Sequence, residues 1–222
     1  MVQHWFTNWF FNTFYCIPIA RSKDTGDRKV DNANSFSRAI EHLDKGGSIF
    51  IAPEGISNLN RRLQELKTGL ARIALSTENE KDFKLGLQIQ PFGLNYTGQR
   101  YFRSSVVVNC GVPFTIEQYQ EAYEKEPRET VRQLTEDLAA RMRELIIDTT
   151  DQAEDELLKT LGQIFQAKEP LALKEQFLRS KNKLAQLKQL RARDEEAYQA
   201  WQAKAVSLAT QLTEQKTHQA AL

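Results

Sequence analysis

Residues 34–55 constrain the fold more than any other stretch of the chain. A helix is predicted over residues 34–43, because apolar side chains recur there at helical spacing: Phe36, Ala39, Ile40 and Leu43. Gly46 and Gly47 follow and suit a left-handed helix cap. The apolar residues 48–52 then predict a strand, which Pro53-Glu54-Gly55 ends. A helix followed directly by a strand favours a layered α/β arrangement.

The flanking segments extend this alternation. Residues 15–20 predict a short strand, in which Pro18 favours an edge position. A helix is predicted beyond Arg62, with Leu66, Leu70, Ile73 and Ala74 on its inner side. Residues 85–96 and 106–110 supply two more apolar stretches, which predict strands. The fold class we expect is α/β, with a mixed sheet flanked by helices.

Strand signals stop near Thr115, and the remainder of the chain predicts helices with breaks at Pro127, at Thr149-Thr150 and at Pro170. We therefore expect an α/β domain over residues 1–114 and an all-helical extension over residues 115–222. An incomplete apolar seam follows Leu173, interrupted by Arg191 and Asp194. This seam favours a solvated helical hairpin over a coiled-coil dimer, which needs several sustained heptads.

Charge and cysteine content exclude some classes of protein. The chain has 30 basic and 29 acidic residues, so no overall field attracts nucleic acid, and any phosphate recognition must be local. Cys16 and Cys110 lie among apolar neighbours and suit reduced core thiols, although one disulfide stays open as the alternative. No metal-ligand spacing of cysteine and histidine occurs, and no apolar run reaches the roughly 18–20 residues that span a bilayer.

The first fifteen residues are rich in aromatic side chains. Phe6, Phe10 and Phe14 recur at helical spacing, with Trp5 and Trp9 beside them. Such a helix packs on a core or dips into a membrane interface, where Trp and Phe are favoured. Both interpretations are compatible with opposite edges of one helix.

Four sequence blocks, in this order and spacing, resemble the glycerol-phosphate and lysophosphatidate acyltransferase family. They are Ile17-Pro18-Ile19-Ala20-Arg21, Gly46 to Gly55 with its Pro-Glu-Gly end, Leu66-Lys67-Thr68-Gly69 to Ala74, and Ile89-Gln90-Pro91-Phe92-Gly93-Leu94-Asn95-Tyr96. The resemblance covers about residues 10–114. It implies transfer of an acyl group from acyl-CoA or acyl carrier protein, as co-substrate, to glycerol 3-phosphate or a lysophospholipid, with no other cofactor and no metal.

The resemblance also assigns substrate-binding residues. Arg21 matches the family's basic position and suits bidentate phosphate binding, whereas the residues alone leave pairing with Asp24 or Asp27 equally open. In the Pro53-Glu54-Gly55 block, Glu54 is placed to bind acceptor hydroxyls or a basic neighbour, and Gly55 allows close backbone approach. Lys67, near a helix start, adds phosphate attraction or is a solvated lysine.

Two departures from the family pattern matter. Where the family often has Phe-Pro-Glu-Gly-Thr-Arg-Ser, this chain has Ala52-Pro53-Glu54-Gly55-Ile56-Ser57-Asn58, and Arg61 or Arg62 is the proposed substitute for the arginine. The family's catalytic histidine, followed five positions later by aspartate, has no match. His4 is followed at that distance by Trp9 and His42 by Gly47, while His218 lies too near the end.

We therefore expect no catalytic residue in this chain and interpret it as a truncated member, inactive by itself, of an acyltransferase family in phospholipid synthesis. The alternative is a non-catalytic phospholipid-binding or membrane-associated interaction protein. In either case the expected location is cytoplasmic, peripheral to a membrane, and the expected partners are an acceptor phospholipid precursor and an acyl donor rather than nucleic acid. An unrelated hydrolase or nucleotide enzyme is disfavoured, because Gly-x-Ser-x-Gly and P-loop motifs are missing.

Overall fold

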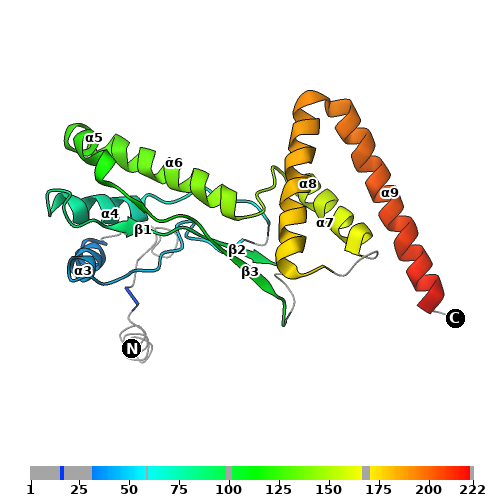
Figure 1. Ribbon diagram of the computed structural model, residues 1–222, viewed down its shortest axis with the longest axis horizontal. Coiled ribbons are helices and arrows are strands. Elements are labelled where there is room, and N and C mark those ends of the chain that lie inside the picture. Colours follow the sequence, from blue (N-terminus) through cyan, green and yellow to red (C-terminus); the bar gives the residue numbers. More distant parts are fainter. Residues whose placement is uncertain (1–15, 18–31, 59, 99–101, 167–170, 221–222) are drawn as a thin grey trace, which may run out of the picture. The chain divides into compact units, whose positions relative to one another are not determined.

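Helices and short antiparallel strands make up the computed structural model, which describes residues 16–17, 32–58, 60–98, 102–166 and 171–220 (Figure 1). The chain divides into two units that its path visits alternately. Unit 1 comprises Met1–Gly55, Leu66–Ile89 and Phe114–Glu136, and unit 2 comprises Ile56–Glu65, Gln90–Pro113 and Asp137–Leu222. The predicted α/β class is confirmed at the level of mixed helices and strands.

Helices α3 (Ala33–Asp44) and α4 (Gly69–Asn79) pack against each other in unit 1. The predicted helix over residues 34–43 is confirmed as α3, with Ala39 buried. Gly46 adopts a φ of 77°, and its N–H bonds the Leu43 carbonyl, so the glycine ends α3 as predicted. Helix α4 begins three residues after Leu66 and buries Ile73 and Ala74.

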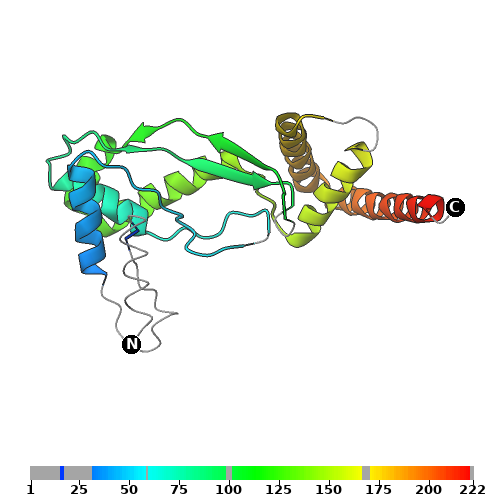
Figure 2. The same cartoon turned by 90° about the horizontal axis from the view of Figure 1, so that it is seen from below.

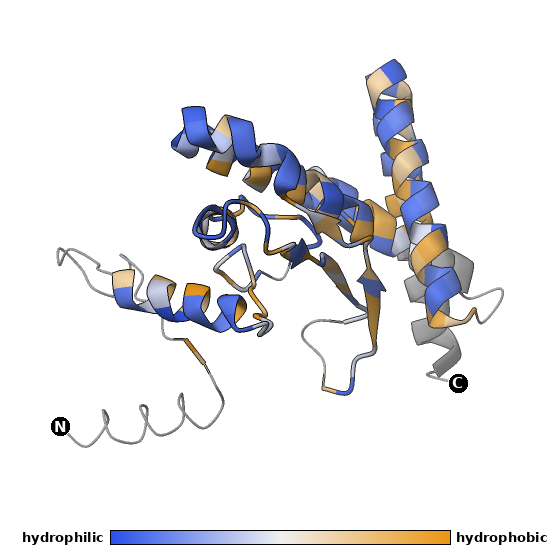
Figure 3. Cartoon of the chain, turned by 60° about the vertical axis from the view of Figure 1, so that its left-hand side comes forward, coloured by the Kyte–Doolittle hydropathy of each residue, from blue (hydrophilic) through white to orange (hydrophobic). Residues whose placement is uncertain are grey.

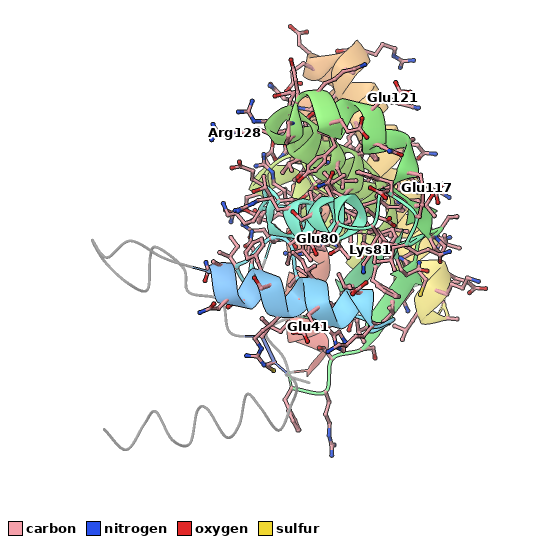
Figure 4. All side chains as sticks on the ribbon, turned by 90° about the vertical axis from the view of Figure 1, so that its left-hand side faces the viewer. Glu41, Glu80, Lys81, Glu117, Glu121 and Arg128 are labelled. Atoms are coloured by element: carbon pink, nitrogen blue, oxygen red, sulfur yellow. The ribbon has the colours of Figure 1, made fainter. Side chains whose placement is uncertain are left out.

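A buried carboxylate shapes the chain after α4. Glu78 is fully buried, and its two oxygens accept the backbone N–H groups of Leu85 at 3.1 Å and Leu87 at 2.5 Å. These bonds direct the chain into β1 (Gln88–Ile89), which pairs antiparallel with β4 (Phe114–Thr115). By contrast, three other charged residues of this unit, Glu80, Lys81 and Arg128, which are labelled in Figure 4, are exposed.

The remaining elements of unit 1 follow β4. They are η1 (Glu117–Tyr119), α5 (Gln120–Lys125) and the first half of α6 (Pro127–Leu145). Pro127 is the first residue of α6, where its missing N–H costs nothing, and this confirms the predicted break. Phe83 contacts Tyr123 edge to face at 6.1 Å, which ties the loop after α4 to α5.

Unit 2 contains a β-hairpin of β2 (Phe92–Tyr96) and β3 (Val106–Cys110), seen side by side in Figures 1 and 2. The expected strand over residues 85–96 is thus split into β1 and β2 around Pro91, which lacks an N–H to donate. The strand over residues 106–110 is confirmed as β3.

Three helices form the rest of unit 2, namely α7 (Gln152–Gln166), α8 (Leu173–Arg193) and α9 (Glu195–Ala220). They pack together around Leu157, Leu187 and Tyr198. The break at Thr149-Thr150 is confirmed, and Pro170 lies outside the described residues, between α7 and α8. All elements described after residue 116 are helices, whereas their separation from a domain ending at residue 114 stays a prediction.

Three expectations were wrong. Residues 48–52 form no strand, although burial alternates along them, because alternation specifies an extended chain and not a partner to pair with. The described strands form two antiparallel pairs rather than one mixed sheet. Cys16 and Cys110 form no disulfide, as expected, but both are exposed rather than in a core. The strand predicted over residues 15–20 lies outside the described residues apart from Cys16 and Ile17, which are not in a strand.

Candidate functional site

The Pro53-Glu54-Gly55 segment forms a tight turn in unit 1. The Gly55 N–H bonds the Ala52 carbonyl at 3.2 Å, and Gly55 has a φ of 65°. A side chain at this left-handed position would be strained, so glycine fits the turn. Glu54 sits at the turn's corner, half-buried.

Lys67 is brought against this turn from twelve residues further along the chain. Its backbone N–H donates to the Pro53 carbonyl at 2.8 Å. A Cβ placed on Gly55 would lie 3.5 Å from the Lys67 Cγ, so the stem of the lysine passes beside the glycine. Lys67 itself is exposed. Four of the predicted site residues, Pro53, Glu54, Gly55 and Lys67, are therefore neighbours.

The start of α4 adds partial positive charge to that of the Lys67 ammonium. Gly69 opens the helix, and Thr68 precedes it without a side-chain cap hydrogen bond. The first N–H groups of a helix lack intrahelical acceptors and carry the positive end of the helix dipole. Arg72, in the first turn, lies over the Phe36 ring at 4.8 Å. Lys67 and the start of α4 thus follow directly beside the turn that carries Glu54, a combination able to bind a phosphorylated polyol through phosphate and hydroxyl groups.

Arg21, the fifth predicted site residue, lies outside the described residues. The suggestion that Arg61 replaces the family's arginine is not supported, because its guanidinium is engaged elsewhere. Arg61 Nε donates to Asp155 Oδ1 at 2.6 Å, and Nη2 donates to the Asp155 carbonyl at 3.1 Å. Arg62 is exposed. Nothing in the sequence signalled the partner of Arg61, which lies 94 residues away.

His42 was predicted to be exposed just before the cap of its helix, and the structure confirms this. Its Nε2 donates to the Ser48 carbonyl at 3.2 Å. His4 lies outside the described residues, as does the side chain of His218. Within the described part of the chain, no group of three or more His, Cys, Asp or Glu side chains is arranged to hold a metal ion.

Comparison with known proteins shows what the part of the chain that carries this site is similar to. Residues 1–95 match the model of the family described as Acyltransferase. The chain is 36% identical over 107 residues, 48% of its length, to glycerol-3-phosphate O-acyltransferase 2 of Saccharomyces cerevisiae, and spans 14% of that protein. It is 30% identical over 152 residues, 65% of its length, to glycerol-3-phosphate O-acyltransferase 1 of the same yeast, and spans 20% of it. No solved structure matches.

Proposed function

We propose that this chain serves acyl transfer in glycerolipid synthesis by binding the phosphorylated glycerol acceptor, because residues 1–95 match the model of the Acyltransferase family. The observation that carries the proposal is the placement of Lys67 beside the Pro53-Glu54-Gly55 turn. The acceptor is glycerol 3-phosphate or a lysophospholipid, and the donor is acyl-CoA or acyl carrier protein. Both substrates are proposed from the family and from the names of the two yeast relatives.

Each residue has a role that its chemistry suits. The Lys67 ammonium and the first N–H groups of α4 attract the acceptor phosphate. Arg21 adds a bidentate guanidinium to the same phosphate. The Glu54 carboxylate accepts hydrogen bonds from glycerol hydroxyls, and Gly55 keeps the backbone open to the ligand. The roles of Lys67 and the Pro53-Glu54-Gly55 turn rest on residue chemistry and on contacts within unit 1, whereas that of Arg21 rests on the family's basic position alone.

A second candidate function is supported by the lack of a histidine–aspartate pair at the family's spacing in these 222 residues. None of the three histidines is followed five positions later by an aspartate, so the 222 residues contain no motif for abstracting the acceptor's proton. In the second candidate the chain binds phospholipid headgroups, peripherally at the cytoplasmic face of a membrane, and transfers nothing. Within the described residues, no helix is both long and apolar enough to cross a bilayer.

The acceptor-binding proposal is tested by titrating the purified chain with glycerol 3-phosphate in a calorimeter. Lys67→Gln removes one charge-assisted hydrogen bond and is expected to weaken binding about tenfold. Lys84→Gln is the matched control, because Lys84 is an exposed lysine of the same unit whose nearest carboxylate is Asp82 at 3.7 Å. Equal weakening by both variants would refute the role of Lys67, and absence of binding to glycerol 3-phosphate and to a lysophospholipid alike would refute the proposal.

An acyl-transfer assay separates the two candidates. When acyl-CoA and glycerol 3-phosphate are supplied, the second candidate function predicts that coenzyme A is released no faster with the protein than without it. Turnover above that rate would exclude the second candidate. It would also require a proton acceptor other than a His-Asp pair at the family's spacing.

A further inference from the structure

The hairpin of β2 and β3 exposes an apolar face. In the antiparallel register, Leu94 lies opposite Val108 and Tyr96 lies opposite Val106. Alternation of side chains places every second residue of each strand on one face of the sheet. We call this the outer face, and its members are Phe92, Leu94, Tyr96, Val106, Val108 and Cys110. All six are exposed, Leu94 to 47% and Val108 to 52%, and Figure 3 colours much of these strands as hydrophobic.

The opposite, inner face is held firmly within unit 2. The Asn95 and Asn109 side-chain amides both donate to the Leu145 carbonyl, at 3.0 and 2.8 Å. A Cβ at Gly93 would overlap that same carbonyl, so the strand lies directly on it. Val107 packs against buried residues that include Ile147. Because the inner face is fixed by these contacts, the hairpin cannot turn its outer face inward without losing them.

The tip of the hairpin carries an aromatic side chain and a cation. Phe102 is 93% exposed, and the Arg103 guanidinium lies 5.7 Å from the centre of its ring. An aromatic ring beside an arginine suits the boundary between lipid headgroups and acyl chains, where the ring enters the apolar layer and the cation meets phosphate.

The charge of this region has a single sign. Residues 90–113 contain Arg100 and Arg103 and no aspartate or glutamate, in a chain that has 29 acidic residues in all. An apolar hairpin whose own charged residues are all positive is complementary to a surface that is apolar beneath a negative layer. Anionic phospholipid bilayers have this construction.

We propose that the outer face of the hairpin, together with Phe102 and Arg103, docks on the surface of a bilayer containing anionic phospholipids. The hairpin lies in the interface and does not cross the bilayer, since its strands are five residues long and a spanning strand needs about ten. Docking requires neither acceptor binding nor acyl transfer. It is therefore tested on vesicles that contain no lysophospholipid or glycerol phosphate.

The experiment measures sedimentation of the whole 222-residue chain with phosphatidylcholine vesicles, with and without phosphatidylserine. We expect binding to the vesicles that contain phosphatidylserine, weakened by added salt. The double substitution Leu94→Thr with Val108→Thr keeps residues that favour strands while removing apolar surface, and it should lower the partition coefficient about tenfold. Phe102→Ser should lower it to a similar degree.

Matched controls come from exposed apolar residues elsewhere in the chain. Val206→Thr corresponds to the Val108 change, because Val206 is 53% exposed on α9. Phe50→Ser corresponds to the Phe102 change, because Phe50 is 79% exposed in unit 1. Both controls should leave the partition coefficient unchanged. Arg103→Asn is expected to weaken binding to the anionic vesicles about fivefold, and asparagine tolerates the φ of 64° at this position.

A second measurement locates the contact without substituting any residue of the outer face. A polarity-sensitive fluorophore attached to Cys110 in the Cys16→Ser variant should shift to the blue on anionic vesicles. An unchanged emission while the protein sediments would place the contact elsewhere and overturn the proposal. Equal losses in hairpin and control variants, or no binding of the unaltered chain, would overturn it as well. Loss of a dimer rather than of lipid binding in the double variant would assign the face to a second copy of the chain.

Discussion

At the scale of single residues, Asn95 is the polar side chain on which the hairpin most depends. Its Nδ2 donates to the Leu145 carbonyl at 3.0 Å, and its Oδ1 accepts the Ile147 N–H at 3.0 Å. Asn95→Asp replaces the donor by an oxygen that faces the Leu145 carbonyl. The free energy of unfolding should fall by about 2 kcal/mol, measured by urea unfolding at neutral pH.

Asn79→Asp is the control for this change, because Asn79 is exposed at the last position of α4. Its effect should stay within about 0.5 kcal/mol. If the two substitutions lowered the stability equally, the bonds of Asn95 to the end of α6 would contribute nothing measurable to the fold.

Local motifs predicted contacts between residues near in sequence and failed for distant ones. Pro53, Glu54, Gly55 and Lys67 are neighbours, as the resemblance implied, because one short loop separates the turn from α4. The sequence did not indicate the bond of Arg61 to Asp155, because that contact is fixed only by the tertiary fold. Asn95 lies in a largely apolar stretch of the sequence, which gives no sign that its amide joins a strand to a helix end.

At the scale of elements, periodicity located helices better than strands. Helix α3 was predicted to within one residue at each end, because an apolar face and a glycine cap act locally. Strand β3 was also predicted, from its run of valines. Residues 48–52 have the same apolar character, yet no described residue pairs with them. A strand depends on a partner that its own sequence does not specify.

The ion pair between Asp151, just before α7, and Arg191 of α8 should make the stability of the chain depend on pH. The Arg191 guanidinium, 2.8 Å from Asp151 Oδ2, lowers the pKa of Asp151 below its ordinary 3.8, and the Glu154 N–H contributes in the same direction. Asp151→Asn keeps the capping bond to Glu154 but removes the ion pair with α8. At neutral pH the free energy of unfolding should fall by no more than about 1 kcal/mol, since both side chains are partly exposed.

The sign of the pH dependence follows from the lowered pKa. Stabilisation by the Asp151 carboxylate is complete above its ordinary pKa and is lost as the pH falls through the lower folded value. Urea unfolding between neutral pH and about pH 3 should show the original and Asp151→Asn chains converging toward acid. A constant difference across that range would show that the ion pair does not cause the loss.

At the scale of the whole molecule, the chain passes repeatedly between its two units. Residues 90–113 belong to unit 2, and residues 114–136 return to unit 1. Composition changes near Thr115, and this change suggested a boundary between an α/β domain and a helical extension. Composition reports which elements form, whereas the contacts that group them depend on tertiary packing. The boundary can therefore be tested only by separating the parts.

Fragments 1–114 and 115–222 provide that test. Fragment 115–222 lacks the hairpin, so the Leu145 carbonyl loses both asparagine donors and the cluster around Ile147 loses Val107. We expect the helices of this fragment to unfold at lower urea concentration than those of the whole chain, a loss of about 3 kcal/mol or more. Adding fragment 1–114 should restore part of the loss, because it carries the hairpin. An unfolding midpoint equal to that of the whole chain would instead establish residues 115–222 as an independent domain, with the hairpin a mere attachment to it.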